Sequence, residues 1–376
     1  MKFSPDRRRV LALGVAAGAA LAADAVLPKL ALAKPRQATL EQCLAMTPEE
    51  MARTSPHVIH AMDYIKKTVT TVKDSGMRSA VMAVLSNPAP TLLARMDSKV
   101  RGEVFQELTA KGYLKDAQAD TYLPPAASPD RATQPFLATP GSGYQSHHSY
   151  PGGLVTHTAG NLKISLAIFE TYRNVYGITL DRDEVVVSQT LHDLHKPWVF
   201  QWEKSGESRK ENTLAGTGEH HVLSIAESIV RGLPASTVVA QACAHTHPGT
   251  DKDEAEVVGW IAAAAIIAGV DPVGAGLLEQ GGKTLPVPRK MEGFITHLGD
   301  HDFVLTVPAA KWTIAALGDV ARKHYGMGET DLKGPKFNAL RNYAFSQATV
   351  EELYSVYATQ GQEGLASAVT AMVKPA

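Results

Sequence analysis

Apolar residues recur along this chain mostly at spacings of three and four positions, which place them on one face of a helix. Residues 185–198 show the pattern clearly: apolar positions from Val186 to Leu194 follow Asp183, a candidate N-cap, and Pro197 limits the helix length. Alanine is abundant, and alternating patterns typical of strands are sparse. We therefore predict an all-α fold.

The same pattern and the capping signals predict further helices elsewhere. Thr47-Pro48-Glu49-Glu50 reads as a capping box that opens a helix, and Thr349 opens the last one. Other helices are expected over 58–65, from about 91 to 111, after the Pro151–Gly153 turn, and over 219–230, 238–247 and 257–270.

Breaks in the helical pattern suggest five segments. The chain of 376 residues is long enough to bury a large core. The segments are a signal peptide (1–33), a helical N-terminal region (34–123), a Pro-rich linker (124–143), a domain that carries the chemistry (144–285) and a helical C-terminal region (286–376).

The first segment resembles a twin-arginine export signal. Arg7-Arg8-Arg9 precede a mild apolar stretch from Val10 to Val26, and Ala31-Leu32-Ala33 follow as a small-residue cleavage pattern. The resemblance implies the twin-arginine export machinery as a partner and the bacterial periplasm as the destination. An uncleaved anchor is the alternative, although Asp24 and Pro28 shorten the apolar run. No span is expected in the mature chain.

Charge and cysteine content limit the classes of protein to which this chain can belong. A net charge near −1 provides no overall field for nucleic acid. The two cysteines, Cys43 and Cys243, could form one bridge after export but no disulfide framework. Histidine is the unusual residue, with 14 in the chain.

The adjacent pair His192-Asp193 is the centre of the candidate chemistry. It falls at the end of a buried helix, where an ionised carboxylate is costly unless a cation neutralises it. Several imidazoles and carboxylates on packed helices can hold one or two divalent ions of the Mn, Fe, Co, Ni or Zn kind. Asp193 is then the natural bridge between two ions. The candidate ligands in chain order are His157, His192, Asp193, His221, His245, His247 and Asp271.

Three separated motifs, HHSYPGGLVTHT, HDLHK and HVLSIAESI, occur in the order found in the HD-domain metal-dependent phosphohydrolases, and residues 144–275 resemble that superfamily. The resemblance implies an all-α HD-domain helical bundle, with helical segments added at both ends. The core ligands it implies are His157, His192, Asp193 and Asp271, with His221 and one or both of His245 and His247 at a second position.

The resemblance also implies hydrolysis of a small-molecule phosphoester by a metal-activated water. The catalytic residues would be Asp193, which orients the water, Lys196, which contacts a substrate phosphate, and His195. His147, His148 and His195 are alternative proton donors, and His148 and Tyr150 are predicted to contact the substrate. Two departures from the family pattern are His195 before the lysine and the single residue that separates His245 from His247.

Two other functions remain open at this point. The same scaffold hosts mixed-valence di-iron oxygenases with nearly these ligands, and a non-catalytic periplasmic metal or ligand binder would also keep the ligands.

Two local interpretations bear on the site. His220 is expected to point away from the apolar face of its helix. Gly299–Asp302 is expected to be a polar turn, with a metal or substrate loop as the alternative.

Overall fold

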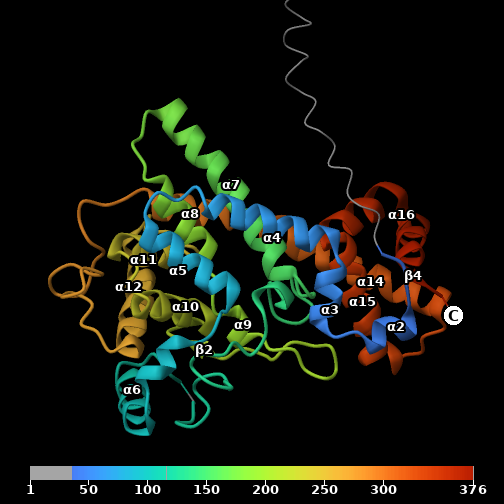
Figure 1. Cartoon of the computed structure of the whole chain (residues 1–376), viewed down its shortest axis with the longest axis horizontal. Coiled ribbons are helices and arrows are strands. Elements are labelled where there is room, and N and C mark those ends of the chain that lie inside the picture. The colour runs from blue at the N-terminus through green and yellow to red at the C-terminus, as the bar shows by residue number, and fades with distance from the viewer. Residues whose placement is uncertain (1–35, 116, 376) are drawn as a thin grey trace, which may run out of the picture. The chain divides into compact units, whose positions relative to one another are not determined.

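The computed structural model describes residues 36–115 and 117–375, and the predicted export signal lies outside this range. The prediction of an all-α fold is confirmed, because helices dominate the described chain and its strands are very short (Figure 1). The helices are α2 (Leu40–Ala45), α3 (Pro48–Thr54), α4 (Pro56–Val69), α5 (Ser75–Ser86), α6 (Ser98–Ala110), α7 (Gly153–Tyr176), α8 (Arg182–Leu191), α9 (Lys196–Val199), α10 (Glu219–Val230), α11 (Ala235–Ala242), α12 (Asp251–Ala268), α13 (Glu292–Gly299), α14 (Phe303–Tyr325), α15 (Pro335–Ala348) and α16 (Val350–Met372).

Two short strand pairs join segments of the chain. The parallel pair of β1 (Ala38–Thr39) and β4 (Val373–Lys374) ties the beginning of the described chain to its end. The antiparallel pair of β2 (Thr213–Leu214) and β3 (Thr217–Gly218) lies just before α10. Short 3-10 turns occur at Thr91–Arg95, Phe136–Ala138 and Asp331–Lys333.

Several helix boundaries follow from capping side chains. Thr47 and Glu50 form the predicted capping box at the start of α3, and Thr349 caps α16. The cap of α8 is Asp181, not Asp183 as predicted, because its carboxylate accepts the N–H groups of Asp183 and Glu184. Asp183 is instead nearly buried and accepts backbone N–H groups from the turn before α5. The predicted helix over 91–111 is interrupted because Asp97 caps α6.

The larger hydrophobic core extends from Ala52 to Leu285 and gathers helices from both sides of the Pro-rich segment. α4 packs along α7, and α10 packs against α12 (Figure 1). Gly152 permits the close approach before α7: its φ is 86°, and a Cβ there would collide with the side chain of Val58. The segments 34–123 and 144–285 thus share one core, whereas their division into separate domains stays a prediction.

A second core joins the two ends of the described chain. α14 packs on α16, and α15 packs on α2 and α3 (Figure 1). Ala38, Cys43 and Met51 are buried in it together with residues from Ala310 to Val373.

The two cysteines do not form the bridge that was considered. Both are free and buried, Cys43 in the second core and Cys243 in the larger one. Burial raises the pKa of each thiol to about 12, so both side chains act as small apolar residues.

Within the described residues, the segment Glu292–Tyr325 is long and apolar enough to cross a membrane by length and composition alone, and 44% of its apolar window is buried. A core helix of a soluble protein meets the same criterion. In the structure this segment is two helices, α13 and α14, and the junction between them contributes Asp300 to the site described next.

Candidate metal centre

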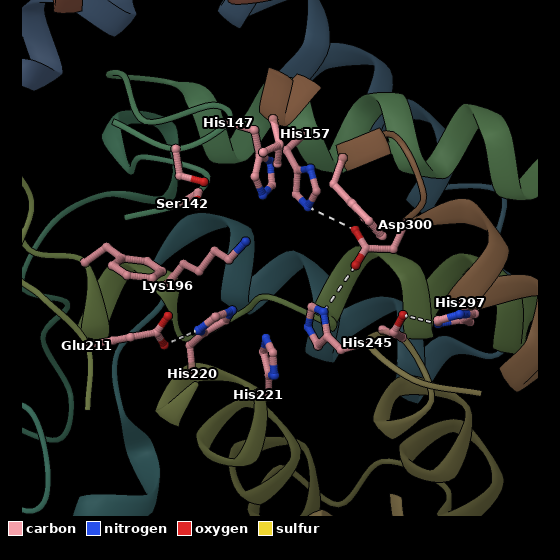
Figure 2. Close-up of a pocket in the computed structure, with 15 residues that line it drawn as sticks. Ser142, His147, His157, Lys196, Glu211, His220, His221, His245, His297 and Asp300 are labelled. Carbon is pink, nitrogen blue, oxygen red and sulfur yellow. Dashed lines mark hydrogen bonds and ion pairs between the residues drawn. The ribbon is translucent and has the colours of Figure 1, made fainter. Parts of the chain in front are cut away.

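The candidate site forms where α7, α10, the residues between α8 and α9, the residues after α11 and the end of α13 converge (Figure 2). Asp193, just after α8, lies at its centre and is 1% exposed. Its two carboxylate oxygens face two different groups of histidines.

The first group faces Oδ2 of Asp193. That oxygen lies 3.2 Å from Nε2 of His157 and 3.1 Å from Nε2 of His192. Oδ1 of Asp300 lies 3.2 and 3.4 Å from the same two nitrogens. All four side chains are buried. Four potential ligand atoms therefore surround one point.

The orientation of His192 shows why this point suits a cation. Its Nδ1 lies 2.7 Å from the carbonyl oxygen of Gln189, and donation there leaves a lone pair on Nε2 of the neutral ring. That Nε2 lies 3.4 Å from Nε2 of His157. Two imidazole nitrogens that converge beside two carboxylates are the arrangement that a divalent ion satisfies.

The second group faces Oδ1 of Asp193. That oxygen lies 3.5 Å from Nε2 of His220 and 3.6 Å from Nε2 of His245. The ring of His221 stacks on His245, with 3.4 Å between centroids. Glu211 holds Nδ1 of His220 at 2.6 Å, which points Nε2 into the site (Figure 2). Ligand atoms of the three histidines lie close enough to share one ion.

The electrostatics differ between the two groups. Burial opposes a charge on His192, but Asp193 and Asp300 raise its pKa to about 9. Burial likewise opposes ionisation of Asp193, but the charges of His192 and Lys196 hold its pKa well below the usual range. At the second group, burial and then the neighbouring His245 lower the pKa of His221. The first position thus attracts positive charge, and His221 at the second offers a neutral nitrogen.

Unpartnered buried atoms support the fit of metal ions to these residues. Among the described residues, Oδ1 of Asp193 and Nε2 of His245 are buried without a hydrogen-bond partner. Oδ2 of Asp193 also makes no geometrically proper hydrogen bond, although three nitrogens lie close to it. Close approach without hydrogen-bond geometry is expected where a cation lies between the groups. Imidazoles with carboxylates are a donor set for transition-metal ions.

A cavity of about 310 Å³ opens onto both groups. Lys196 lines it, and its Nζ contacts Asp193 and the carbonyl oxygen of Gly141. His147 also faces the cavity, and Phe303 and Val307 add apolar surface. A small ligand could therefore contact a cationic side chain and both candidate ion positions at once.

The structure brings most of the predicted ligands together. His157, His192 and Asp193 meet at the first position, and His221 and His245 lie at the second. Lys196 lies within contact distance of Asp193, as its place three residues further along the chain allows.

Asp271 is not part of the site, which corrects the prediction. α12 ends at Ala268, and the exposed carboxylate of Asp271 accepts the N–H group of Gly274 in the next turn. It lines a different cavity, beside Glu107 and Lys111. The acid that completes the first position is Asp300, one helix later. Gly299–Asp302, interpreted as a polar turn with a metal or substrate loop as the alternative, does form the turn between α13 and α14, and Asp300 lies in the site from there.

His220 was also missed, because it was expected to point away from the packed face of its helix. The β2–β3 pair and the loop before α10 cover the first turn of this helix, so His220 is buried. The carboxylate of Glu211 in that loop was the available signal, since an acid hydrogen-bonded to an imidazole often orients a ligand.

Four further predicted residues make other contacts. His195 is fully buried against Glu227, with its ring on the edge of Trp198. The buried Tyr150 hydrogen-bonds Thr156 and lies 3.2 Å from the buried ring of His148. His247 packs near Phe294 and His297 and accepts the N–H group of Gly249. The positions of His195, His148 and Tyr150 do not support the contacts with substrate that were predicted for them. Of His245 and His247, only His245 lies at the second position.

No protein-family model matches the chain, and no solved structure matches it. A stretch of 107 residues is 32% identical to the dihydroneopterin 2',3'-cyclic phosphate phosphodiesterase of Methanocaldococcus jannaschii. The matched part is 26% of this chain and 39% of that protein. Part of the chain is thus similar to a phosphodiesterase, and the described chain contains histidine–aspartate clusters that could hold metal ions.

Proposed function

We propose that this chain is a metal-dependent phosphohydrolase of the HD-domain kind. The observation that carries the proposal is the position of Asp193, which presents one oxygen to each of two groups of buried histidines. The partial similarity to a phosphodiesterase agrees with it.

The proposed role of each residue follows from its position in the site. His157, His192, Asp193 and Asp300 would hold one divalent ion, and His220, His221 and His245 would hold a second through the other oxygen of Asp193. Such ions supply a water of lowered pKa and offset charge on phosphoryl oxygens. Lys196 is positioned to bind a phosphate oxygen at the same place, because its amino group lies beside Asp193 in the cavity wall.

His147 is the histidine that reaches the cavity from the loop before α7. Burial, and then the neighbouring His148 and His157, hold its pKa well below the usual range. An imidazole that is unprotonated at neutral pH is a poor proton donor. We therefore do not assign His147 the role of proton donor that was considered from the sequence.

The cavity limits the substrate. Its volume of about 310 Å³ suits a small molecule with a phosphate group. Phosphomonoesters, phosphodiesters and nucleotides are the candidates, and 2′,3′-cyclic phosphodiesters are included because the matched relative is named for one.

The test begins with metal quantification on protein purified without added metal, followed by turnover on a panel of these esters. Asp193→Asn should lose the ions of this site and the turnover together. Asp271→Asn is the matched control, because that carboxylate lies in a different cavity and should leave both unchanged. Retention of full metal content and activity by Asp193→Asn would contradict the proposal.

Oxygen consumption separates the remaining alternatives. Uptake of O2 with an alcohol or phosphonate, without hydrolysis of any ester, would indicate the di-iron oxygenase. Bound metal without either reaction would indicate a binding protein.

We also propose export to the periplasm through the twin-arginine route. The support is the Arg7-Arg8-Arg9 run and the apolar stretch after it. Replacement of all three arginines by lysine should leave the chain in the cytoplasmic fraction of a bacterial host. Unchanged periplasmic recovery would exclude this route.

A further inference from the structure

A separate cluster of ligand-type side chains lies behind His157, on the side away from Asp193. His148 comes from the loop before α7, Asp302 from the junction of α13 and α14, and Glu351 from the first turn of α16. Nε2 of His148 lies 3.0 Å from Oδ2 of Asp302 and 3.4 Å from Oε1 of Glu351. None of the three lines the catalytic cavity, so the proposed reaction gives them no role.

The imidazole of His148 is held with Nε2 toward both carboxylates. Its side chain is 5% exposed, and its Nδ1 lies 3.2 Å from the hydroxyl of Tyr150, which also bonds to Thr156. Donation from Nδ1 to that hydroxyl would leave a lone pair on Nε2. A lone pair facing two carboxylates is unfavourable unless a cation lies between them.

Buried oxygen atoms in this cluster lack hydrogen-bond partners. Among the described residues, neither Oδ1 of Asp302 nor Oε1 of Glu351 has one. Nδ1 of His147 is also buried without a partner, and that residue lies close enough to share an ion with His148 and Asp302. Buried carboxylate oxygens without donors are a marker of a bound ion.

The two distances from His148 have the size that metal coordination requires. Ligand atoms that bind one ion at about 2.0–2.2 Å lie roughly 3.0–3.5 Å apart at octahedral or tetrahedral angles. The two distances from His148 lie within that range.

We propose that His148, Asp302 and Glu351 bind a third divalent cation, distinct from the two positions around Asp193. One imidazole and two carboxylates favour Mn, Fe or Zn. Oδ1 of Asp302 lies 3.6 Å from Nδ1 of His157, so it can orient the ring whose Nε2 faces the first position. The ion ties the loop before α7 to the C-terminal region, which supplies two of its three ligands.

The alternative is a protonated imidazole between two carboxylates, with no ion. The number of ions per chain distinguishes the two arrangements. Protein stripped by a chelator, reloaded with Mn(II) and desalted should hold three ions per chain by plasma mass spectrometry. Glu351→Gln should hold two, and Asp193→Asn should keep the one bound by His148, Asp302 and Glu351.

Glu352→Gln is the matched control. Glu352 follows Glu351 in the same helical turn and also lies near an imidazole, 3.4 Å from Nε2 of His57, but its side chain is 45% exposed. It should hold as many ions as the unmodified chain. Equal metal content in Glu351→Gln and Glu352→Gln would overturn the third site.

Anomalous diffraction from a Mn(II)-loaded crystal of the unmodified chain tests the site without any variant. A peak among His148, Asp302 and Glu351 is expected. Peaks beside Asp193 without one at this cluster would remove the third site and leave the proposed function intact. Peaks at neither place would contradict both.

Discussion

Glu227 on α10 provides a quantitative test of why His195 lies away from the cavity. Its carboxylate is fully buried and accepts the N–H groups of Thr91 and Leu92. It also lies 2.8 Å from Nε of Arg231 and 3.3 Å from Nε2 of His195. We interpret His195 as a structural residue that anchors the segment after Asp193 to α10, and we expect Glu227→Gln to destabilise the fold.

The size of the effect follows from the pKa of Glu227. Burial opposes its ionisation, but the hydrogen bond and charge of His195, together with Arg231 and Thr91, lower the pKa from 4.5 to about 2. At 1.36 kcal/mol for each pKa unit, this shift corresponds to about 3 kcal/mol of folding free energy. Because the folded-state pKa is depressed, this stabilisation is present above pH 4.5 and is lost as the pH falls toward 2.

Urea unfolding followed by tryptophan fluorescence measures this contribution, because Trp198 packs edge-on against His195. At pH 7, in a chelating buffer, Glu227→Gln should lower the free energy of unfolding by about 3 kcal/mol. The difference from the unmodified chain should shrink by pH 3. Glu256→Gln, at an exposed position on α12, should change little at either pH. An equal loss at pH 7 and pH 3 would refute the reasoning.

Three further predictions concern the site and the chain ends. Lys196→Met should keep the metal and raise KM for a phosphoester about 10–100-fold, the loss expected for one charged hydrogen bond; unchanged kinetics would remove Lys196 from substrate binding. Glu211→Gln should weaken the second metal position about 10–100-fold because it orients His220, and equal affinity in a metal titration would contradict this. Deletion of residues 373–376 removes β4 and should lower the melting temperature, whereas an unchanged value would show that the β1–β4 pair adds no stability.

The sequence predicted the helical class and most of the side chains that meet at the candidate site, because these depend on local patterns. His157, His192 and Asp193 occur in motifs whose helical spacing already places them near helix ends. Asp271 and Asp300 each follow an apolar helix, and the local pattern does not distinguish them. Only the packing of α13 against α7, α8 and α11 decides that Asp300 returns to the site.

The error at His220 has a similar origin. Helical periodicity assigns a face to each residue relative to its own helix, but it does not include a loop that covers the opposite face. The loop with Glu211 covers that face here, so His220 becomes a buried ligand candidate. His148, Asp302 and Glu351 also come from three distant segments, and no local pattern relates them.

The pairing of β1 with β4 has a consequence for the synthesis of the chain. The second core needs Ala38, Cys43 and Met51 from near the beginning and residues up to Val373 from the end. This core therefore cannot close until the chain has been synthesised past Val373 and that segment has left the ribosome. The larger core contains residues only up to Leu285, so it can form earlier. Ala38, Cys43 and Met51 stay exposed until the C-terminal helices are available to cover them.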